Sequence, residues 1–387
     1  MTLYGGYLFY ICLVVGLIPA IVLGTMQKPI KYYALFISIV FIGLVLANDI
    51  HQLLSFFGFF LLELVIVKGY LLLRQKYGRN EKIYYCGVFL SLLPLILNKC
   101  SPLFHLNIFG IIGISYLTFR TVQMVIEMYD GVITEFSAFE YAGFMLFFPT
   151  LSCGPIDRSR RFGQDWNQIY SREEYLELVG TGLFKLLLGL IYKLIIAVQF
   201  YKLMGFFDGN QWYLSIGYAY LYGFYLFFDF AGYSLMAVGT SYILGIRTPD
   251  NFRRPFVAKD MREFWDRWHI SLSYWFRDFV FSRFIMKCVK KKWLGTRLQR
   301  ASAGFIVNMF IMGMWHGLTV SYLLYGLYHG VLLAMTEVYQ KKSPFYAKYK
   351  DVGAYQAVSW FVTLQLVMLG FLIFSGRFVE LLNVGGK

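Results

Sequence analysis

Long apolar runs separated by short polar connections dominate the pattern of this chain. Many of the runs reach the roughly 18 residues that an α-helix needs to cross a bilayer. The pattern predicts an all-α, polytopic integral membrane protein with about 10–12 transmembrane or re-entrant helices. The runs lie near residues 4–24, 30–47, 52–73, 83–97, 106–126, 139–153, 178–206, 212–230, 231–246, 301–317, 321–339 and 353–374.

The run at residues 139–153 interrupts a regular alternation of sides. Connections rich in Lys and Arg belong on the cytoplasmic side, and the first four runs alternate cleanly with the N-terminus outside. This run is flanked by two connections that both look cytoplasmic, and it is short and ends at Gly154-Pro155. We therefore expect a re-entrant or half-spanning segment here.

Residues 212–246 present the same conflict. We expect a break at Asp229-Phe-Ala-Gly232, so that one of the two runs on either side does not cross. Non-helical backbone at membrane depth is tolerated only where it is buried in protein or lines a cavity. Two such departures together predict a cavity inside the membrane.

Composition agrees with this class of protein. The chain is 58% hydrophobic and 20% aromatic, with a mean hydropathy of +0.56, far outside the range of soluble domains. The first apolar run has no early Lys or Arg and no small-residue cleavage site after it, which favours a first transmembrane helix over a signal peptide. The hydropathy also excludes nucleic acid as the reason for the net charge of +14.

The positive charge is concentrated in one segment. Between Arg247 and Arg300, 14 Lys or Arg residues stand against 5 Asp or Glu residues. By the positive-inside rule this segment belongs on the cytoplasmic side of the membrane.

Three of the five histidines lie in residues 251–330, each beside bulky aromatic residues. Histidine is the side chain best suited to proton transfer near neutral pH. Within this region, residues 261–284 have the apolar spacing of one amphipathic helix, which would lie at the cytoplasmic interface. On such a helix Asp266, three residues before His269, is placed to orient its imidazole. The alternative is an interfacial histidine that serves structure alone. His269 would share its face with Arg262, Trp265, Asp266, Ser273 and Phe276.

His316 ends an apolar run whose only strongly polar member is Asn308. An imidazole buried there without a partner costs roughly 1–3 kcal/mol, so it needs either a partner or a task. His329 falls inside the following helix, where packing is at least as good an explanation as catalysis. His51 and His105 fall at outer helix ends and carry no functional expectation.

Other catalytic patterns are absent from the sequence. It contains no His-Glu-x-x-His motif, no metal-spaced Cys or His cluster and no phosphate-binding glycine loop. The chemistry must therefore come from histidine as an acid or base, and we expect no cofactor to be bound by this chain.

Three motifs together resemble the signature of the membrane-bound O-acyltransferase family. They are Asn251-Phe-x-x-Pro-Phe, then Phe264-Trp-Asp-Arg-Trp-His-Ile-Ser-Leu-Ser-Tyr-Trp-Phe-Arg-Asp278, then Trp315-His-Gly. The resemblance implies a single domain over residues 1–387, a helical ring around a central tunnel, and a catalytic motif region at residues 251–330. It implies that His316 is the catalytic base and His269 a second site residue. Candidate substrate-binding residues are Trp315, Asp266, Trp265, Ser273, Asn308 and His329.

Within the family, the chain resembles the branch that D-alanylates teichoic acid. The segments Phe148–Arg158 and Phe279–Trp293 carry this likeness, whereas the alginate-acetylating branch continues differently after Arg-Asp. The resemblance implies that D-alanine passes from the phosphopantetheine thioester of a small acidic carrier protein in the cytoplasm. It also implies that the acceptor is a teichoic acid hydroxyl outside the plasma membrane of a Gram-positive type cell.

Two basic clusters offer a surface for the acidic carrier, although positive-inside topology alone would also place them there. Two rival functions remain open, namely O-acetylation of a polysaccharide and transport of an alanylated intermediate. A transporter often shows paired repeats, and none is found here. The clusters comprise Arg158, Arg160 and Arg161, and Lys290, Lys291 and Lys292.

Overall fold

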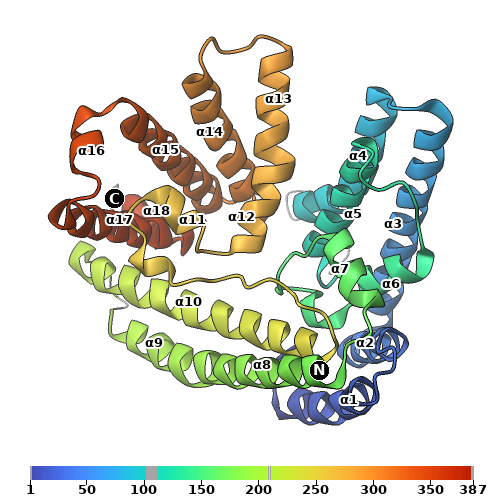
Figure 1. Cartoon of the computed structure of the whole chain (residues 1–387). Coiled ribbons are helices and arrows are strands. Elements are labelled where there is room, and N and C mark those ends of the chain that lie inside the picture. Colours follow the sequence, from blue (N-terminus) through green and yellow to red (C-terminus); the bar gives the residue numbers. More distant parts are fainter. Residues whose placement is uncertain (1, 102–110, 208, 210, 385–387) are drawn as a thin grey trace. The chain divides into compact units, whose positions relative to one another are not determined.

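The computed structural model describes residues 2–101, 111–207, 209 and 211–384 of this chain, and His105 lies outside them. Within these ranges the fold is helical and has no strand beyond an isolated bridge between Thr2 and Gly5, so the all-α prediction is confirmed (Figure 1). Among the described residues, six helical segments are long and apolar enough to cross a membrane. They are α1 (Tyr7–Thr25), α3 (Ile50–Tyr77), α4 (Glu81–Cys100), the continuous segment Arg172–Phe207, α10 (Trp212–Ile243) and α17 (Gly353–Phe374).

The chain divides into two compact units. The first comprises Met1–Leu190 and Gly232–Pro249, and the second comprises Ile191–Ala231 and Asp250–Lys387. Besides α1, α3 and α4, the first unit contains α2 (Lys31–Leu46), α5 (Ile114–Tyr129), α6 (Ala138–Leu146), η2 (Phe148–Thr150), α7 (Ser159–Asn167) and α8 (Arg172–Leu190).

In the first unit, α8 and the C-terminal part of α10 cross with their backbones nearly touching. A Cβ atom added to Gly189 would lie 2.6 Å from the carbonyl oxygen of Gly232, and one added to Gly239 would lie 2.4 Å from that of Gly182. On each helix the two glycines are seven residues apart and share one face. Small residues of this kind let membrane helices approach closely.

The predicted break at Asp229–Gly232 is wrong, because α10 runs without interruption from Trp212 to Ile243. Gly232 serves the close crossing with Gly189 and does not end a helix. A single helix of this length can connect an outer turn with the basic cytoplasmic segment. The conflict of sides over residues 212–246 is thereby removed.

The short run at residues 139–153 forms the nine-residue helix α6 followed by the turn η2. Nine residues rise only about 14 Å, less than half of the hydrocarbon core. Arg120 on α5 holds this segment, and its side chain is 1% exposed. The guanidinium donates to the carbonyl oxygens of Phe144 and Met145 and to both oxygens of Thr150, at 2.5–3.3 Å. We call this arrangement the Arg120 cage.

The second unit contains the motif region. Its remaining elements are η3 (Ile191–Ile196), α9 (Ala197–Met204), η4 (Gly205–Phe207), η5 (Pro255–Val257), α11 (Met261–Trp265), α12 (Ile270–Phe276), η6 (Arg277–Phe281), α13 (Ser282–Lys290), α14 (Arg297–His316), α15 (Val320–Lys342), α16 (Pro344–Tyr349) and α18 (Arg377–Val384). The single amphipathic helix predicted over 261–284 is wrong. The chain breaks between α11 and α12, where His269 adopts a left-handed conformation with φ 45° and ψ 53°.

Helices α14 and α15 form the tightest pair in the second unit. A Cβ atom added to Gly313 would lie 2.4 Å from the carbonyl oxygen of Tyr322, and one added to Gly326 would lie 2.5 Å from that of Met309. A Cβ atom on Gly330 would lie 2.8 Å from the Cα atom of Ile306. This backbone contact fixes the C-terminal end of α14, which carries His316, against the first turns of α15.

Candidate active site

The loop that begins at Asn251 shapes the turn around His269. The carbonyl oxygen of Asn251 accepts a hydrogen bond from the amide of Ile270 at 2.9 Å. Its side-chain Oδ1 accepts from the amide and the hydroxyl of Ser271, at 3.3 and 2.6 Å. Asn251 thus satisfies an amide in the first turn of α12, which a residue at the N-cap position usually does. His269 occupies that N-cap position and makes no capping bond with its side chain.

The imidazole of His269 lies in an aromatic environment. The residue is 4% exposed, and Phe230 and Phe252 pack against its ring at centroid distances of 4.7 and 6.5 Å. Its Nε2 atom has no hydrogen-bond partner among the described residues. Burial, and secondarily the nearby His316, lowers the pKa of His269 to about 3. The side chain is therefore neutral near pH 7.

The helix break also separates Asp266 from His269. Asp266 forms the C-cap of α11, whereas His269 begins α12. Among the hydrogen bonds described for this unit, none joins the Asp266 carboxylate to the imidazole. Orientation of His269 comes instead from the backbone turn and its aromatic neighbours.

His316 is the last residue of α14 and is half-buried. Its ring packs edge-on against Phe374 at 5.0 Å and lies 4.6 Å from Trp315. From α15, the rings of Tyr322 and Tyr325 approach to 5.9 and 6.1 Å. His316 is also close enough to His269 to act on it electrostatically, so the two predicted histidines lie near each other.

A pocket of 280 Å³ lies beside this site in the second unit. Met312, which lines it, precedes His316 by one helical turn, about 6 Å along α14. Neither His269 nor His316 lines the pocket itself. Four of the predicted substrate-binding residues do line it, namely Trp265, Asp266, Ser273 and Asn308.

Two of these pocket residues have buried polar atoms without a hydrogen-bond partner among the described residues. They are the Nε1 atom of Trp265 and the Oδ1 atom of Asn308, each in a side chain of a residue that is 7% exposed. One is a donor and the other an acceptor. Because buried polar atoms are nearly always paired, a polar ligand in this pocket has two groups available to it.

His329 lies behind the pocket wall and does not line the pocket. It is 1% exposed, and its ring packs edge-on against Trp265 at 5.3 Å and against Tyr325 at 4.5 Å. A Cβ atom added to Gly370 on α17 would lie 2.5 Å from its Nε2 atom. His329 thus supports the side chains that face the site, and it is buried among them.

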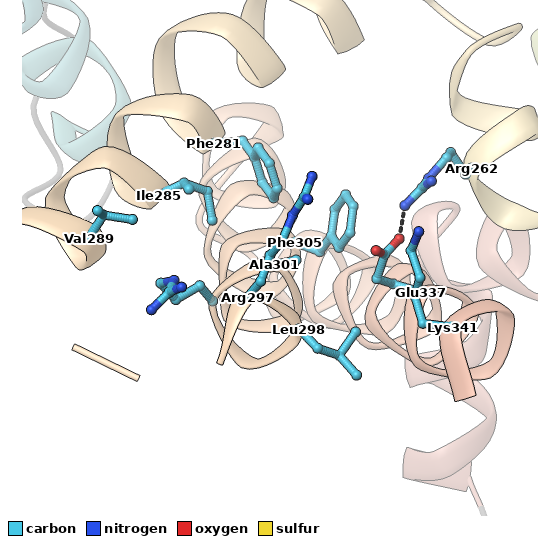
Figure 2. Close-up of a pocket in the computed structure, with 11 residues that line it drawn as sticks. Arg262, Phe281, Ile285, Val289, Arg297, Leu298, Ala301, Phe305, Glu337 and Lys341 are labelled. Carbon is cyan, nitrogen blue, oxygen red and sulfur yellow. Dashed lines mark hydrogen bonds and ion pairs between the residues drawn. The ribbon is translucent and has the colours of Figure 1, made fainter. Parts of the chain in front are cut away.

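A larger pocket of 770 Å³ adjoins the first and shares Arg262, Phe281 and Phe305 with it. Its walls come from α13, α14 and α15, and Figure 2 shows the ion pair between Arg262 and Glu337 on one side of it. Apolar side chains form much of the surface, and basic side chains lie around it. The apolar members are Phe281, Ile285, Val289, Leu298, Ala301 and Phe305, and the basic members are Arg262, Arg297, Arg300 and Lys341.

The two predicted basic clusters differ in their availability. Lys290, Lys291 and Lys292 are all exposed. In the other cluster, Arg161 forms ion pairs with Asp157 and Asp165 on its own chain.

Within this arginine cluster, Arg158 donates to Gln123 at 3.3 Å, whereas Arg160 is exposed. Arg160 is therefore the residue of this cluster best placed to meet a partner. As for metals, the described part of the chain holds no group of three or more His, Cys, Asp or Glu residues that could bind an ion.

The helical fold and the histidine site match a known class of membrane enzyme. The profile of the membrane-bound O-acyltransferase family matches residues 103–375, well over half of the chain, and the chain belongs to this family. It is a multi-pass membrane protein by its family and its apolar helices. The predicted family resemblance is confirmed.

The most informative relatives are teichoic acid D-alanyltransferases. The protein of that name from Bacillus subtilis (strain 168) is 41% identical over 97% of this chain and 98% of its own length. That of Streptococcus thermophilus is 38% identical over 96% of this chain and 94% of its own length. A probable alginate O-acetylase of Pseudomonas syringae pv. tomato is 29% identical, over 71% of this chain and 50% of its own length. The predicted similarity to the D-alanylating branch is confirmed.

Several site residues were not found from the sequence. The helix-capping role of Asn251 was missed, although this residue opens the first motif. Tyr322, Tyr325 and Phe374 around His316 were also missed, because they follow or lie far from the motifs. Aromatic residues make up 20% of the chain, so an aromatic residue alone gives little signal.

Proposed function

We propose that this protein transfers D-alanine from the phosphopantetheine thioester of a cytoplasmic carrier protein to hydroxyl groups of teichoic acid outside the membrane. The observation that carries the proposal is the position of His316. Its half-buried imidazole ends α14 one turn beyond a pocket that has two polar groups available. The names of the D-alanyltransferase relatives support this choice of donor and acceptor.

The reaction needs a base more than it needs an electrophile, because a thioester carbonyl is already activated. His316 takes the proton from the acceptor hydroxyl as its oxygen attacks the D-alanyl carbonyl carbon. The carbon–sulfur bond then breaks, an ester carbon–oxygen bond forms, and the proton passes from the imidazolium to the departing thiolate. Neutral His269 serves as a hydrogen-bonding group that orients the substrate.

One face of α14 supports delivery of the donor from the cytoplasmic side. Asn308, Met312 and His316 follow one another at intervals of four residues and therefore share a face. The fifteen residues from Ala301, in the larger pocket, to His316 span about 22 Å. The basic side chains of the larger pocket suit a phosphate group, and its apolar wall suits an extended arm.

An acidic carrier would dock on exposed positive charge beside the larger pocket of the second unit. Lys290 ends α13 and Lys291 and Lys292 follow it directly, next to the larger pocket that α13 helps to form. Arg160 in the first unit is a further candidate. Residues 251–330 form the catalytic region of a single domain in this proposal, within the plasma membrane of a Gram-positive type cell.

The direct test is reconstitution of the purified protein in vesicles with D-alanyl-loaded carrier and purified teichoic acid. Formation of alkali-labile D-alanyl esters on the acceptor is the expected result. Transfer of acetyl groups to a polysaccharide under matched conditions, with no D-alanyl transfer, would overturn the proposal. Movement of a preformed alanylated lipid without ester formation would point to a transporter instead.

The proposal also requires that His316 be reached from outside. The turn after α14 is sparsely charged, and Thr319 in it is exposed, as is Lys291 in the basic segment before α14. In a cysteine-free background, a cysteine at Thr319 should react with an impermeant thiol reagent added to intact cells. A cysteine at Lys291 should react only after permeabilisation. The opposite pattern at either position would overturn this topology.

A further inference from the structure

A row of tyrosines on α10 lies within the second unit and belongs to none of the sequence motifs. Tyr218, Tyr222 and Tyr225 are followed by Asp229, at intervals of four, three and four residues. These intervals place all four side chains on one face of the helix. We call this row the tyrosine stripe. All four residues are half-buried, so the stripe is neither sealed in the core nor fully exposed.

The rings of the stripe are in contact with one another. Tyr218 and Tyr222 stack with their centroids 5.9 Å apart and an angle of 9° between the planes. Tyr222 and Tyr225 follow at 6.4 Å. At the far end, Asp229 forms an ion pair with Lys193, which lies in the π-helical segment η3. The stripe is therefore a continuous polar and aromatic surface along this part of α10.

The opposite face of α10 has a different task. Phe227, half a helical turn away from the stripe, packs against Phe252 and Phe256 at 5.6 and 5.2 Å. That face holds the loop that precedes His269, and it needs no polar atoms to do so. Tyr220, which shares that face of the helix, donates a hydrogen bond from its hydroxyl to Gln365 at 2.6 Å.

One residue of the stripe is connected to His316 through two tyrosines of α15. The phenol group of Tyr222 interacts electrostatically with those of Tyr322 and Tyr325. Tyr322 and Tyr325 in turn contact the ring of His316 at 5.9 and 6.1 Å. Tyr222 is accordingly the member of the stripe that is linked to the site of proton transfer.

We infer that the tyrosine stripe is the binding surface for the polyol portion of the acceptor, in which the phenol groups hydrogen-bond its hydroxyls and lead one of them to His316. A phenol both donates and accepts a hydrogen bond, and its ring offers an apolar face to the carbon chain of a polyol. A phenol group that faced lipid would find no hydrogen-bonding partner there, and leaving its hydroxyl unpaired would cost free energy. The inference rests on the proposed function, because it assigns the acceptor side of the same site.

The test replaces the hydroxyl groups and keeps the rings. The triple variant Tyr218→Phe, Tyr222→Phe, Tyr225→Phe is reconstituted with D-alanyl carrier and purified lipoteichoic acid, and the rate is measured against each substrate in turn. We expect KM for lipoteichoic acid to rise roughly tenfold or more, because three ordinary hydrogen bonds are lost. The KM for the carrier should stay within twofold of the wild-type value. Tyr213→Phe on the same helix is the matched control, since Tyr213 is 56% exposed and lies outside the stripe.

The outcomes distinguish a failure of the stripe as the acceptor surface from a failure of His316 as the base. A wild-type KM for lipoteichoic acid in the triple variant overturns the stripe as the acceptor surface, while loss of transfer in His316→Ala leaves the proposed function standing. Equal rises in both KM values also overturn the inference. If the triple variant does not fold, Tyr222→Phe alone should raise KM for the acceptor about threefold, and no rise there overturns it. Transfer that persists in His316→Ala contradicts the role of His316 as the base whatever the triple variant does.

Discussion

Arg120 in the first unit and His316 in the second both place a strongly polar group among apolar helices, but their surroundings differ. The guanidinium of Arg120 is 1% exposed and donates to four oxygens of α6 and the turn after it. The imidazole of His316 is half-buried and is bounded mainly by aromatic rings beside a pocket. The first arrangement uses its polar group to hold backbone, whereas the second sets its imidazole among aromatic rings next to a pocket.

The largest expected difference between the two regions comes from replacing His316, which should affect catalysis and not stability. His316→Ala should lower the rate of D-alanyl ester formation by roughly 10²–10⁴-fold, the range that general base catalysis contributes. The amount of protein in the membrane and its melting temperature should not change. The side chain of His316 is only half-buried and lies at a helix end, so its removal disturbs little packing. Reconstituted transfer assays and thermal melting in detergent measure these two quantities.

His51→Ala is the matched control for this prediction. His51 lies in the first turn of α3 and is exposed, so its removal should leave transfer unchanged. Retention of more than about a tenth of the activity in His316→Ala would rule the residue out as the base.

Arg120→Met should have the opposite profile. Several buried oxygens of the Arg120 cage lose their donor, which we expect to cost roughly 3 kcal/mol of stability. The melting temperature should fall, while the protein that remains folded keeps its KM for both substrates. Arg79→Met is the control, because Arg79 is 59% exposed in its ion pair with Asp130 and such pairs contribute little. Equal melting temperatures for the two variants would show that the cage does not hold the segment.

His269 sharpens the comparison, since it is buried like Arg120 but belongs to the site of His316. His269→Ala should lower transfer roughly tenfold or more, and His269→Asn should restore part of it if hydrogen bonding is the role. Burial lowers the pKa of His269 to about 3, so the imidazole gains a proton only as the pH falls toward that value. Between pH 5 and 8 the rate profile of His269→Asn should therefore have the wild-type shape. A limb of the profile that disappears in this variant would assign a proton-transfer role to His269.

The smallest effect is expected at the exposed lysines. Changing Lys290, Lys291 and Lys292 to Glu should raise KM for the carrier roughly fivefold at low salt, because exposed charge pairs contribute little individually. The difference should shrink as salt is added, since screening acts over about 8–10 Å at 0.1–0.15 M. Lys202→Glu on α9 is the control. Carrier binding that ignores both salt and charge reversal would mean that these lysines serve topology alone.

Much of the fold could be predicted from the apolar runs, because run length and charge placement are local properties. The error at Gly232 shows where this reasoning ends. A glycine within an apolar run is compatible with a break or with close helix packing, and the sequence around it does not distinguish them. The deciding fact is the position of Gly189 on another helix. That contact depends on tertiary structure.

The break before His269 escaped prediction for a related reason. Residues 261–284 have helical spacing throughout, yet Asn251, about twenty residues earlier, supplies the hydrogen bonds that stabilise a turn. Local spacing favoured one long helix, and a distant side chain overrode it.

The histidines themselves could be predicted, because an ionisable group in an apolar segment is unusual wherever it points. Four predicted substrate-binding residues could also be placed near them, and they line one pocket. The tyrosine stripe could not be recognised, because its spacing is ordinary for a helix and only its approach to Tyr322 gives it meaning.

The Arg120 cage has a consequence for the order in which the chain is assembled during synthesis. Arg120 belongs to α5, but every acceptor of its guanidinium lies 24–30 residues later in the chain. When α5 first reaches the bilayer, those carbonyls have not yet been inserted, and an unpaired arginine in a helix costs about 2.5–3.5 kcal/mol. We therefore expect α5 and the half-length segment that follows to enter the membrane as one piece, once residue 150 has left the insertion machinery.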